Sequence, residues 1–271
     1  MNAASFSAVL PINKRVKGLA IIENELFIAT ESNTTIEVFN PSNMSSLRLL
    51  VIPGVTSPED MVASLNPKCL YIFDAHGGGK IHQVNIDGST TASWITGSLE
   101  VRLTLSPESN VIVTYLNKNK LKEYKSTADK KLIQQVVLPP NARSAVKLKT
   151  GNFIVSKWEG TCLDSQEGVV EIDTSGKEIN SFTGKEGSVC ESMNCPEYLA
   201  IDKNGSVIVV DRGNRRVLLL NSKLEFQREL LSPTSGLQNP KAIVLDGATN
   251  RLYVADNDIA WDLWRIFVIN L

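Results

Sequence analysis

The stretch VIVVDRGNRRVLLLN, residues 207–221, holds two apolar runs separated by a charged break. The first run is rich in β-branched residues, which favour strands. The break contains Asp211, Gly213 and Asn214, and these residue types are typical of turns. The stretch therefore predicts a β-hairpin. We expect Asp211 to accept backbone N–H groups of the turn, and Gly213 and Asn214 to adopt left-handed backbone.

The same pair of runs occurs six times along the chain. The first run lies at 26–30, 70–74, 111–115, 153–157, 207–211 and 252–256, and the second at 35–40, 80–85, 120–125, 168–173, 216–221 and 265–270. Another short apolar strand precedes each pair. The aligned positions of that strand are 42, 41, 43, 54 and 43 residues apart: Ala20, Val62, Leu103, Val146, Ala200 and Ile243.

A period of this length, with three clear strands and a more variable fourth, is typical of a β-propeller blade. The sixth unit ends after its third strand, and a spare strand at 5–12 precedes the first unit. The sequence therefore predicts an all-β protein, a single six-bladed propeller over residues 1–271 whose ring is closed by the N-terminal strand. A two-sheet sandwich would not need six copies of one unit. The expected blades are 16–57, 58–99, 100–141, 142–194, 195–239 and 240–271 with 5–12.

The fifth unit resembles the NHL repeat, and the sixth matches it in part. The order of blades also looks like the invertebrate NHL propellers grouped with tripartite-motif proteins. The resemblance implies an NHL-type ring that acts as a binding scaffold for proteins or, in some relatives, for RNA. The chain has no CxxC or Cys/His array, so it is not itself a ubiquitin ligase. The matching residues of the fifth unit are Pro196, Leu199, Ala200, Ile201, Asp202, Asn204, Gly205, Val207, Val209, Val210, Asp211, Asn214, Arg216 and Val217.

The composition indicates neither a membrane-spanning segment nor a large net charge. The formal net charge of the 271 residues is −1, and no apolar run is long enough to span a bilayer. The start of the sequence is too short and too polar for a signal peptide. We therefore expect a cytoplasmic monomer with no membrane partner. Secretion stays open because of three clustered cysteines and three sequons, at Cys162, Cys190, Cys195, Asn33, Asn43 and Asn204.

The sequence contains few of the residues that enzymes with a propeller fold use for catalysis. A catalytic zinc needs three protein ligands, whereas the chain has only His76 and His82. Calcium needs six to eight oxygens, and the innermost strands offer only Asp60, Asp202 and Asp246. The sequence therefore predicts no catalytic residue, no metal and no cofactor, and a protein that is not an enzyme. A metal-dependent hydrolase or lyase in the central channel is the weaker alternative.

Basic residues gather in one sector of the ring. Between residues 114 and 157 there are ten lysines and arginines but only two acids, Glu123 and Asp129. Such a sector could bind a phosphate backbone or an acidic peptide, or it could be a solvated outer edge that guards against strand pairing. The expected loop face is the one that carries the loops after the second strands and the loops between blades. Lys118, Arg143 and Lys157 fall on that face.

The same face should carry aromatic and arginine side chains. Trp158, Trp261 and Trp264 lie in its loops, and Arg212 and Arg215 lie in the break of the opening stretch. Aromatic and arginine residues are typical anchors of interfaces, although these tryptophans could also pack within their own loops. We therefore predict a protein or peptide partner on this loop face, with single-stranded or hairpin RNA as the alternative.

Overall fold

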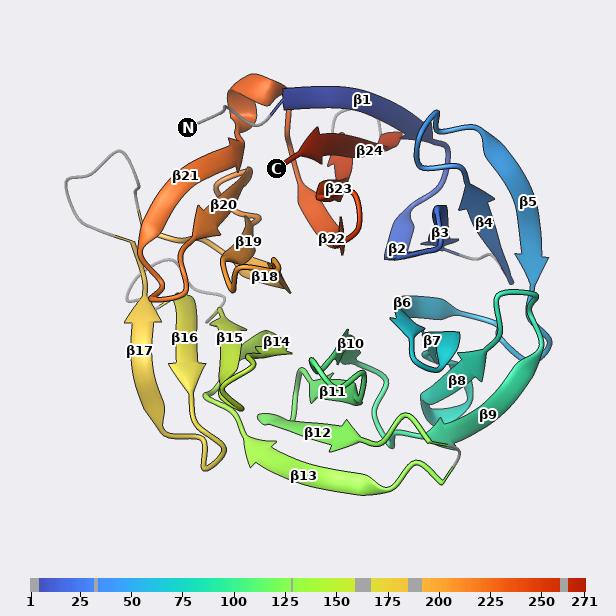
Figure 1. The fold of residues 1–271 in the computed structure, drawn as a ribbon, viewed down its shortest axis with the longest axis horizontal. Coiled ribbons are helices and arrows are strands. Elements are labelled where there is room, and N and C mark those ends of the chain that lie inside the picture. The colour runs from blue at the N-terminus through green and yellow to red at the C-terminus, as the bar shows by residue number, and fades with distance from the viewer. Residues whose placement is uncertain (1–4, 32–33, 128, 159–166, 185–191, 259–262) are drawn as a thin grey trace.

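Six four-stranded antiparallel sheets form the molecule in the computed structural model, which describes residues 5–31, 34–127, 129–158, 167–184, 192–258 and 263–271. The sheets stand around a common centre, with one strand of each facing it and one at the periphery (Figure 1). The predicted six-bladed propeller ring is thereby confirmed. None of the helical segments in the described part of the chain is long and apolar enough to cross a membrane.

Each blade runs outward from its innermost strand in chain order. In the first five blades the strands are β2 (Val16–Ile22) to β5 (Ser46–Val51), β6 (Pro58–Leu65) to β9 (Thr90–Ile95), β10 (Val101–Leu105) to β13 (Leu132–Val137), β14 (Ala142–Lys147) to β17 (Glu178–Phe182), and β18 (Pro196–Ile201) to β21 (Phe226–Leu231). The strands between them are β3 (Glu25–Thr30), β4 (Thr35–Phe39), β7 (Lys68–Asp74), β8 (Lys80–Val84), β11 (Val111–Tyr115), β12 (Lys120–Tyr124), β15 (Phe153–Lys157), β16 (Gly168–Ile172), β19 (Val207–Asp211) and β20 (Arg216–Leu220).

The sixth blade is built from both ends of the chain. It contains β22 (Pro240–Asp246), β23 (Arg251–Asp258) and β24 (Leu263–Asn270), and β1 (Ser5–Ile12) is its outermost strand. β1 pairs antiparallel with β24 from Ser5 opposite Asn270 to Ile12 opposite Trp264. The strand predicted at 5–12 therefore lies in the sixth sheet, beside the last strand of the chain (Figure 1).

The burial of each strand follows from its place in the blade. All five residues of β11 and of β19 are buried, because a second strand is covered by its own sheet and by the neighbouring blades. The outermost strands show an exposed face, and Leu49 and Val51 of β5 are 62% and 64% exposed. The core therefore lies between blades, and five clusters of buried apolar residues make it up in the described ranges.

An aspartate at the end of the second strand fixes the loop between blades. Asp211 accepts the backbone N–H of Asn194 at 2.7 Å and side-chain N–H groups of Asn214 at 2.9 Å and Arg216 at 2.7 Å. Asp74 and Asp256 hold the corresponding loops, each accepting two backbone N–H groups at 2.6–3.0 Å. We expected Asp211 to accept backbone N–H groups of its own hairpin turn. The backbone N–H that it accepts instead belongs to Asn194, in the loop before the blade.

The turn of the opening stretch also differs in its backbone. Arg215 is the residue with positive φ, at 55°, whereas Gly213 and Asn214 are not left-handed. Gly213 is needed for a different reason, since a Cβ atom there would lie 2.4 Å from the side chain of Asn194. The N–H of Gly213 also donates to the carbonyl of Asn194 at 2.8 Å. Close packing of the hairpin on the inter-blade loop therefore explains this glycine.

Candidate functional site

Five of the six innermost strands contain a β-bulge at the same place. The pairing with the second strand shifts between Val16 and Gly18 in β2, and the extra residue is Lys17. A bulge re-aims the side chain of its extra residue and is common beside functional sites. In β10 the pairing is regular, and Arg102 lies at the comparable place. The bulges place one charged residue on each of the other strands: Lys17, Glu59, Arg143, Glu197 and Lys241.

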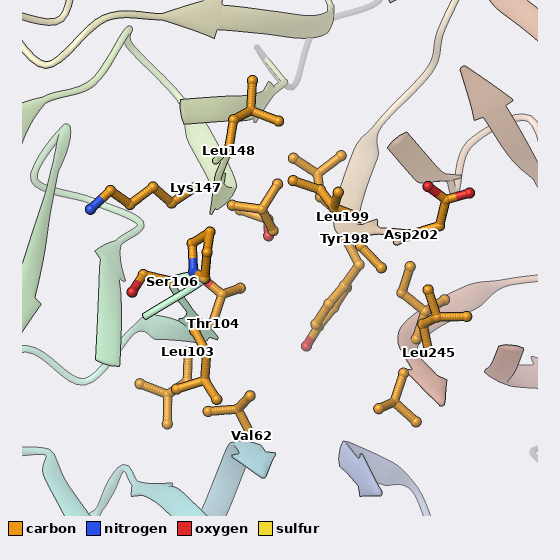
Figure 2. A pocket seen from close by; sticks show the side chains of 18 of the residues that line it. Val62, Leu103, Thr104, Ser106, Lys147, Leu148, Tyr198, Leu199, Asp202 and Leu245 are labelled. Atoms are coloured by element: carbon orange, nitrogen blue, oxygen red, sulfur yellow. The ribbon is translucent and has the colours of Figure 1, made fainter. Parts of the chain in front are cut away.

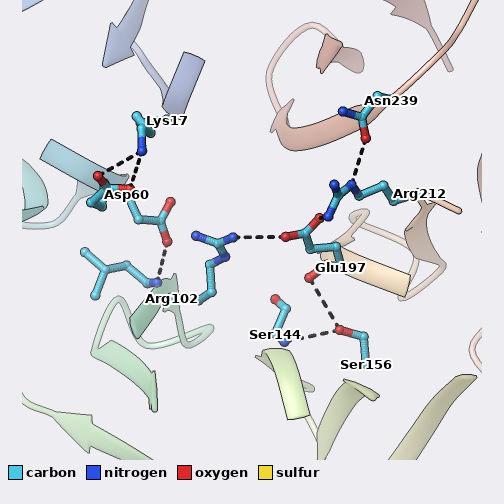
Figure 3. A network of polar contacts seen from close by, with 10 residues as sticks. Lys17, Asp60, Arg102, Ser144, Ser156, Glu197, Arg212 and Asn239 are labelled. Carbon is cyan, nitrogen blue, oxygen red and sulfur yellow. Dashed lines mark hydrogen bonds and ion pairs between the residues drawn. The ribbon is translucent and has the colours of Figure 1, made fainter. Parts of the chain in front are cut away.

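Ion pairs connect most of these charges at one end of the channel. Lys17 contacts Glu59 at 2.9 Å. Glu197 forms ion pairs with Arg102 at 3.4 Å and with Arg212 at 3.2 Å. Figure 3 shows Arg102 of the third blade pointing across the centre toward Glu197 of the fifth. The pair therefore spans the channel, past the fourth blade.

Arg102 also packs on an aromatic ring at this end. Its guanidinium carbon lies 4.4 Å from the ring centroid of Tyr198, which is 9% exposed. Asp60 lies next to this pair, is 3% exposed, and accepts the backbone N–H groups of Met61 at 3.0 Å and Leu103 at 2.8 Å. Burial raises the pKa of Asp60 to about 6, opposed by the positive charge of Arg102 and by the two backbone hydrogen bonds. The three side chains form the polar floor of the cavity.

A cavity of about 750 Å³ extends from this floor along the channel. Its walls are mainly apolar, and Figure 2 shows Tyr198 with its hydroxyl pointing into the space beside Val62 and Leu103. At its other end the cavity reaches the turns that join first and second strands in the third, fourth and fifth blades. All six innermost strands contribute apolar wall residues: Leu19, Ile21, Val62, Leu103, Leu105, Val146, Leu199, Ile201, Ile243 and Leu245. Leu148, directly after β14, adds to this wall.

Lys241 is the cationic member of the bulge set in the sixth blade. Burial, together with the nearby charges of Arg212, Arg15 and Arg102, lowers its pKa to about 8, and Glu197 opposes this shift. Lysine next to several other cations indicates a locally positive potential. The rim of the channel is therefore positively charged around the sixth blade, whereas the charge of Arg102 is balanced by nearby carboxylates.

The structure brings some of the predicted loop-face residues together. The guanidinium of Arg143 lies 4.4 Å from the ring centroid of Trp158, and Lys157 ends the strand beside them. Arg212 is held by Asn239 at 2.7 Å and by Glu197 at 3.2 Å. Arg215 is exposed in its turn. Arg212 is thus part of the channel network and is not a freely projecting anchor.

Other predicted residues lie elsewhere. Trp264 is 2% exposed in β24, opposite Ile12 and Asn257, so its proposed place as a surface anchor is wrong. Its ring fills the core of the sixth blade because the strand, and not the loop, carries it. Lys118 is exposed and donates a hydrogen bond to the carbonyl of Gly97. Trp261, Cys162 and Cys190 lie outside the described residues.

Part of the basic sector is used inside the protein. Lys147 donates to both carboxylate oxygens of Glu123 at 3.0 and 3.1 Å, and Glu123 is fully buried. The Lys130 nitrogen lies 5.2 Å from the ring centroid of Tyr71 and 5.3 Å from that of Trp94. These two lysines stabilise contacts between blades, so the positive surface is smaller than the sequence suggested.

The polar floor was missed at the sequence level. Asp60 was considered only as a calcium ligand, and Arg102 and Tyr198 were not singled out. One signal was present: a charged residue directly follows proline in three innermost strands, at Glu59, Glu197 and Lys241. A charge inside an apolar innermost strand predicts a bulge or a channel-facing site.

The described residues contain no cluster of three or more His, Cys, Asp or Glu side chains able to hold a metal. His82 is 5% exposed and both ring nitrogens lack a hydrogen-bond partner in this part of the chain. Its Nε2 lies 4.0 Å from Asp74, and burial lowers its pKa despite that carboxylate. His82 is therefore a neutral core residue. Cys69 is 1% exposed and is a small buried residue of the core.

No protein-family model matches the chain, and no curated protein matches it. The NHL resemblance therefore stays a prediction. Among solved structures, the chain is similar to a catalytically inactive virginiamycin B lyase from Staphylococcus aureus with quinupristin, at 15% identity over 94% of this chain and 80% of that one, with a TM-score of 0.64. It is also similar to the PQQ-bound aldose sugar dehydrogenase of Streptomyces coelicolor, at 12% identity over 97% and 98%, with a TM-score of 0.67.

A third solved structure is a protein of unknown function from Bacteroides caccae, at 12% identity over 83% and 85% of the chains, with a TM-score of 0.61. At these identities the likeness shows the shared fold. The step from a propeller fold to a scaffold that is not an enzyme is wrong, because similar propellers include a lyase and a dehydrogenase. Fold alone does not decide between binding and catalysis.

Proposed function

We propose that the protein binds a compact, mainly apolar organic molecule in its central cavity. The supporting observation is the combination of about 750 Å³ of space, apolar walls from all six blades and a polar floor of Asp60, Arg102 and Tyr198. Ligand sites in proteins are typically concavities of about 300–1,000 Å³ with a few placed polar groups. Two of the similar structures carry small molecules in their names, quinupristin and PQQ.

The cavity is a better candidate than the loop face because it combines about 750 Å³ of space with apolar walls and a few polar groups. On the loop face Arg212 already has Glu197 and Asn239 as partners, and Trp264 is in the core. A protein or peptide partner there stays a prediction. The observation that favours it is the half-exposed pair of Arg143 and Trp158, since stacked arginine and tryptophan are common interface anchors.

RNA binding also stays a prediction. Lys147 and Lys130 are engaged inside the protein, which leaves Lys118, Lys125 and Lys131 as the exposed lysines of the third blade. Binding of an RNA hairpin that weakens steeply with salt and is lost on Lys118→Glu with Lys157→Glu would favour this alternative.

A cavity-filling variant tests the proposed site. Butylbenzene is titrated into the wild-type protein, Val62→Trp and Val51→Trp, and binding is followed by NMR. Val62 lines the cavity, whereas Val51 is 64% exposed on the outer strand of the first blade. We expect saturable binding to the wild type and Val51→Trp, and loss of binding in Val62→Trp at unchanged thermal stability. Equal binding to all three proteins would place the ligand elsewhere.

A further inference from the structure

We propose that Lys241 and Arg212 bind the carboxylate group of a small organic anion at the loop-face end of the central channel. Neither residue lines the cavity of about 750 Å³, so this site lies beyond the polar floor and does not depend on the proposed cavity ligand. The position of Lys241, the partners of its neighbours and the balance of charge around it support this site.

The bulge of β22 places Lys241 at the channel end. The pairing of β22 with β23 shifts on either side of Lys241, so Lys241 is the extra residue. The extra residues of three other bulges, Lys17, Glu59 and Glu197, form ion pairs at this end of the channel. Because the bulges occupy the same place in their blades, they turn these side chains toward the same region.

Lys241 differs from the other extra residues because it has no partner among the residues that the structure describes. Arg143, the fifth of the set, stacks on Trp158. The Lys241 amino group has neither a hydrogen bond nor an ion pair there, and the half-buried side chain leaves this nitrogen accessible to solvent. A partly desolvated cation without an anion costs free energy, which a bound anion recovers.

Arg212 supplies the second donor of the site. Its Nε donates to Asn239 at 2.7 Å and its Nη1 to Glu197 at 3.2 Å, so the guanidinium is held in place (Figure 3). Its Nη2 has no partner within the described ranges. Asn239 is two residues before Lys241, and the effect of Arg212 on Lys241 is the largest among the neighbouring charges. The two cations therefore lie close together, with N–H groups that the protein itself does not use.

One positive charge is in excess in this network. Its members, linked by ion pairs and charge effects, are five cations and four carboxylates: Arg15, Lys17, Arg102, Arg212, Lys241, Glu31, Glu59, Asp60 and Glu197. Since Glu197 already pairs with two arginines, no carboxylate of the network is left for Lys241. A ligand carboxylate supplies the missing charge, whereas a phosphate dianion would make the network negative beside Glu197.

The pKa of Lys241 gives this site a direct reporter. Burial and the charge of Arg212 lower it to about 8. A carboxylate bound beside the ammonium stabilises the charged form, so binding must raise this pKa. A lysine with a purely structural role would show no such response to a ligand.

Three small probes test the site on the purified protein. Acetate, its neutral analogue acetamide, and inorganic phosphate are titrated at constant ionic strength set with chloride. NMR of isotope-labelled lysine side chains and of the Ala242 backbone amide follows binding. Lys241→Gln removes the charge and Lys241→Arg keeps it. Lys203→Gln is the matched control, because Lys203 is exposed in the turn after β18, at the opposite end of the channel.

We expect acetate to bind saturably and to raise the pKa of Lys241, and acetamide to do neither. Lys241→Gln should weaken acetate about tenfold or more, the effect of losing one hydrogen bond to a charged group, whereas Lys241→Arg and Lys203→Gln should bind it as the wild type does. Phosphate should bind more weakly than acetate.

Four results would each overturn the carboxylate site: an acetate effect no stronger than that of chloride, equal binding of acetamide, wild-type affinity in Lys241→Gln, or tighter binding of phosphate. None of them bears on the cavity, because Lys241 and Arg212 do not line it. The titration with butylbenzene therefore decides the proposed function separately.

Discussion

Arg102 of the third blade lies with its guanidinium 4.4 Å from the ring centroid of Tyr198 in the fifth blade, at the end of the central cavity. The two residues are brought together only when the ring is assembled, because they lie on blades that are not adjacent. Glu197 directs Arg102 across the channel, and Asp60 adds a buried negative charge from the second blade. Three blades therefore meet at this contact.

We expect Arg102→Met to destabilise the ring. Removing the guanidinium leaves Asp60 as a buried carboxylate without its nearest cation, a change that typically costs about 3 kcal/mol or more. The measurement is urea unfolding at neutral pH, followed by circular dichroism. The double variant with Asp60→Asn should recover part of the loss, since the uncompensated charge is removed. No recovery in the double variant would show that Arg102 acts through packing on Tyr198.

Asp60 should give the stability an unusual pH dependence. Its pKa is about 6 in the folded protein and 3.8 in an unfolded chain, so the folded state binds the extra proton between these values. Stability contributed by this group is therefore highest below pH 3.8 and falls as pH rises to 6, by about 3 kcal/mol in total. The difference in unfolding free energy between wild type and Asp60→Asn, measured across this range, isolates the effect. Parallel pH profiles would contradict it.

The fold was predictable because its signal is local and repeated. Each blade carries its own apolar runs and turns, and the aligned residues from Ala20 to Ile243 fix the period without any long-range information. The N-terminal strand was predictable from a missing fourth strand in the sixth unit. Nothing in that pattern needs knowledge of which blades face each other across the channel.

The candidate site was not predictable in the same way. Arg102 and Glu197 are 95 residues apart, and their contact depends on the curvature of the whole ring. The bulges that turn Glu59 and Lys241 toward the channel end appear only in the strand register. Trp264 failed as a surface anchor for a related reason: it is the second residue of β24 and is 2% exposed there, and the sequence does not mark where that strand begins.

We expect Asp211→Ala to be among the most destabilising single changes. Asp211 is fully buried, and its loss leaves Arg216, 5% exposed, without its closest acceptor and releases the N–H of Asn194. Loss of one partner of a buried ion pair costs about 3–5 kcal/mol. Asp173→Ala is the control, because Asp173 accepts two backbone N–H groups in an exposed turn, where the loss of stability should be much smaller. Both variants are measured by urea unfolding. A similar loss of unfolding free energy in the two would contradict the proposed role of the buried contacts of Asp211.

Lys130 should stabilise the contact between the second and third blades. Its ammonium lies 5.2 Å from the ring centroid of Tyr71 and 5.3 Å from that of Trp94, and it donates to the carbonyl of Ser126 at 3.1 Å. Because this cation is partly desolvated, we expect Lys130→Ala to lower the free energy of unfolding by about 1–2 kcal/mol and to change the fluorescence of Trp94. The neighbouring Lys131 is exposed, so Lys131→Ala should change stability by less than about 0.5 kcal/mol. An equal effect of the two substitutions would show that net charge in the sector, and not the aromatic contact, determines stability.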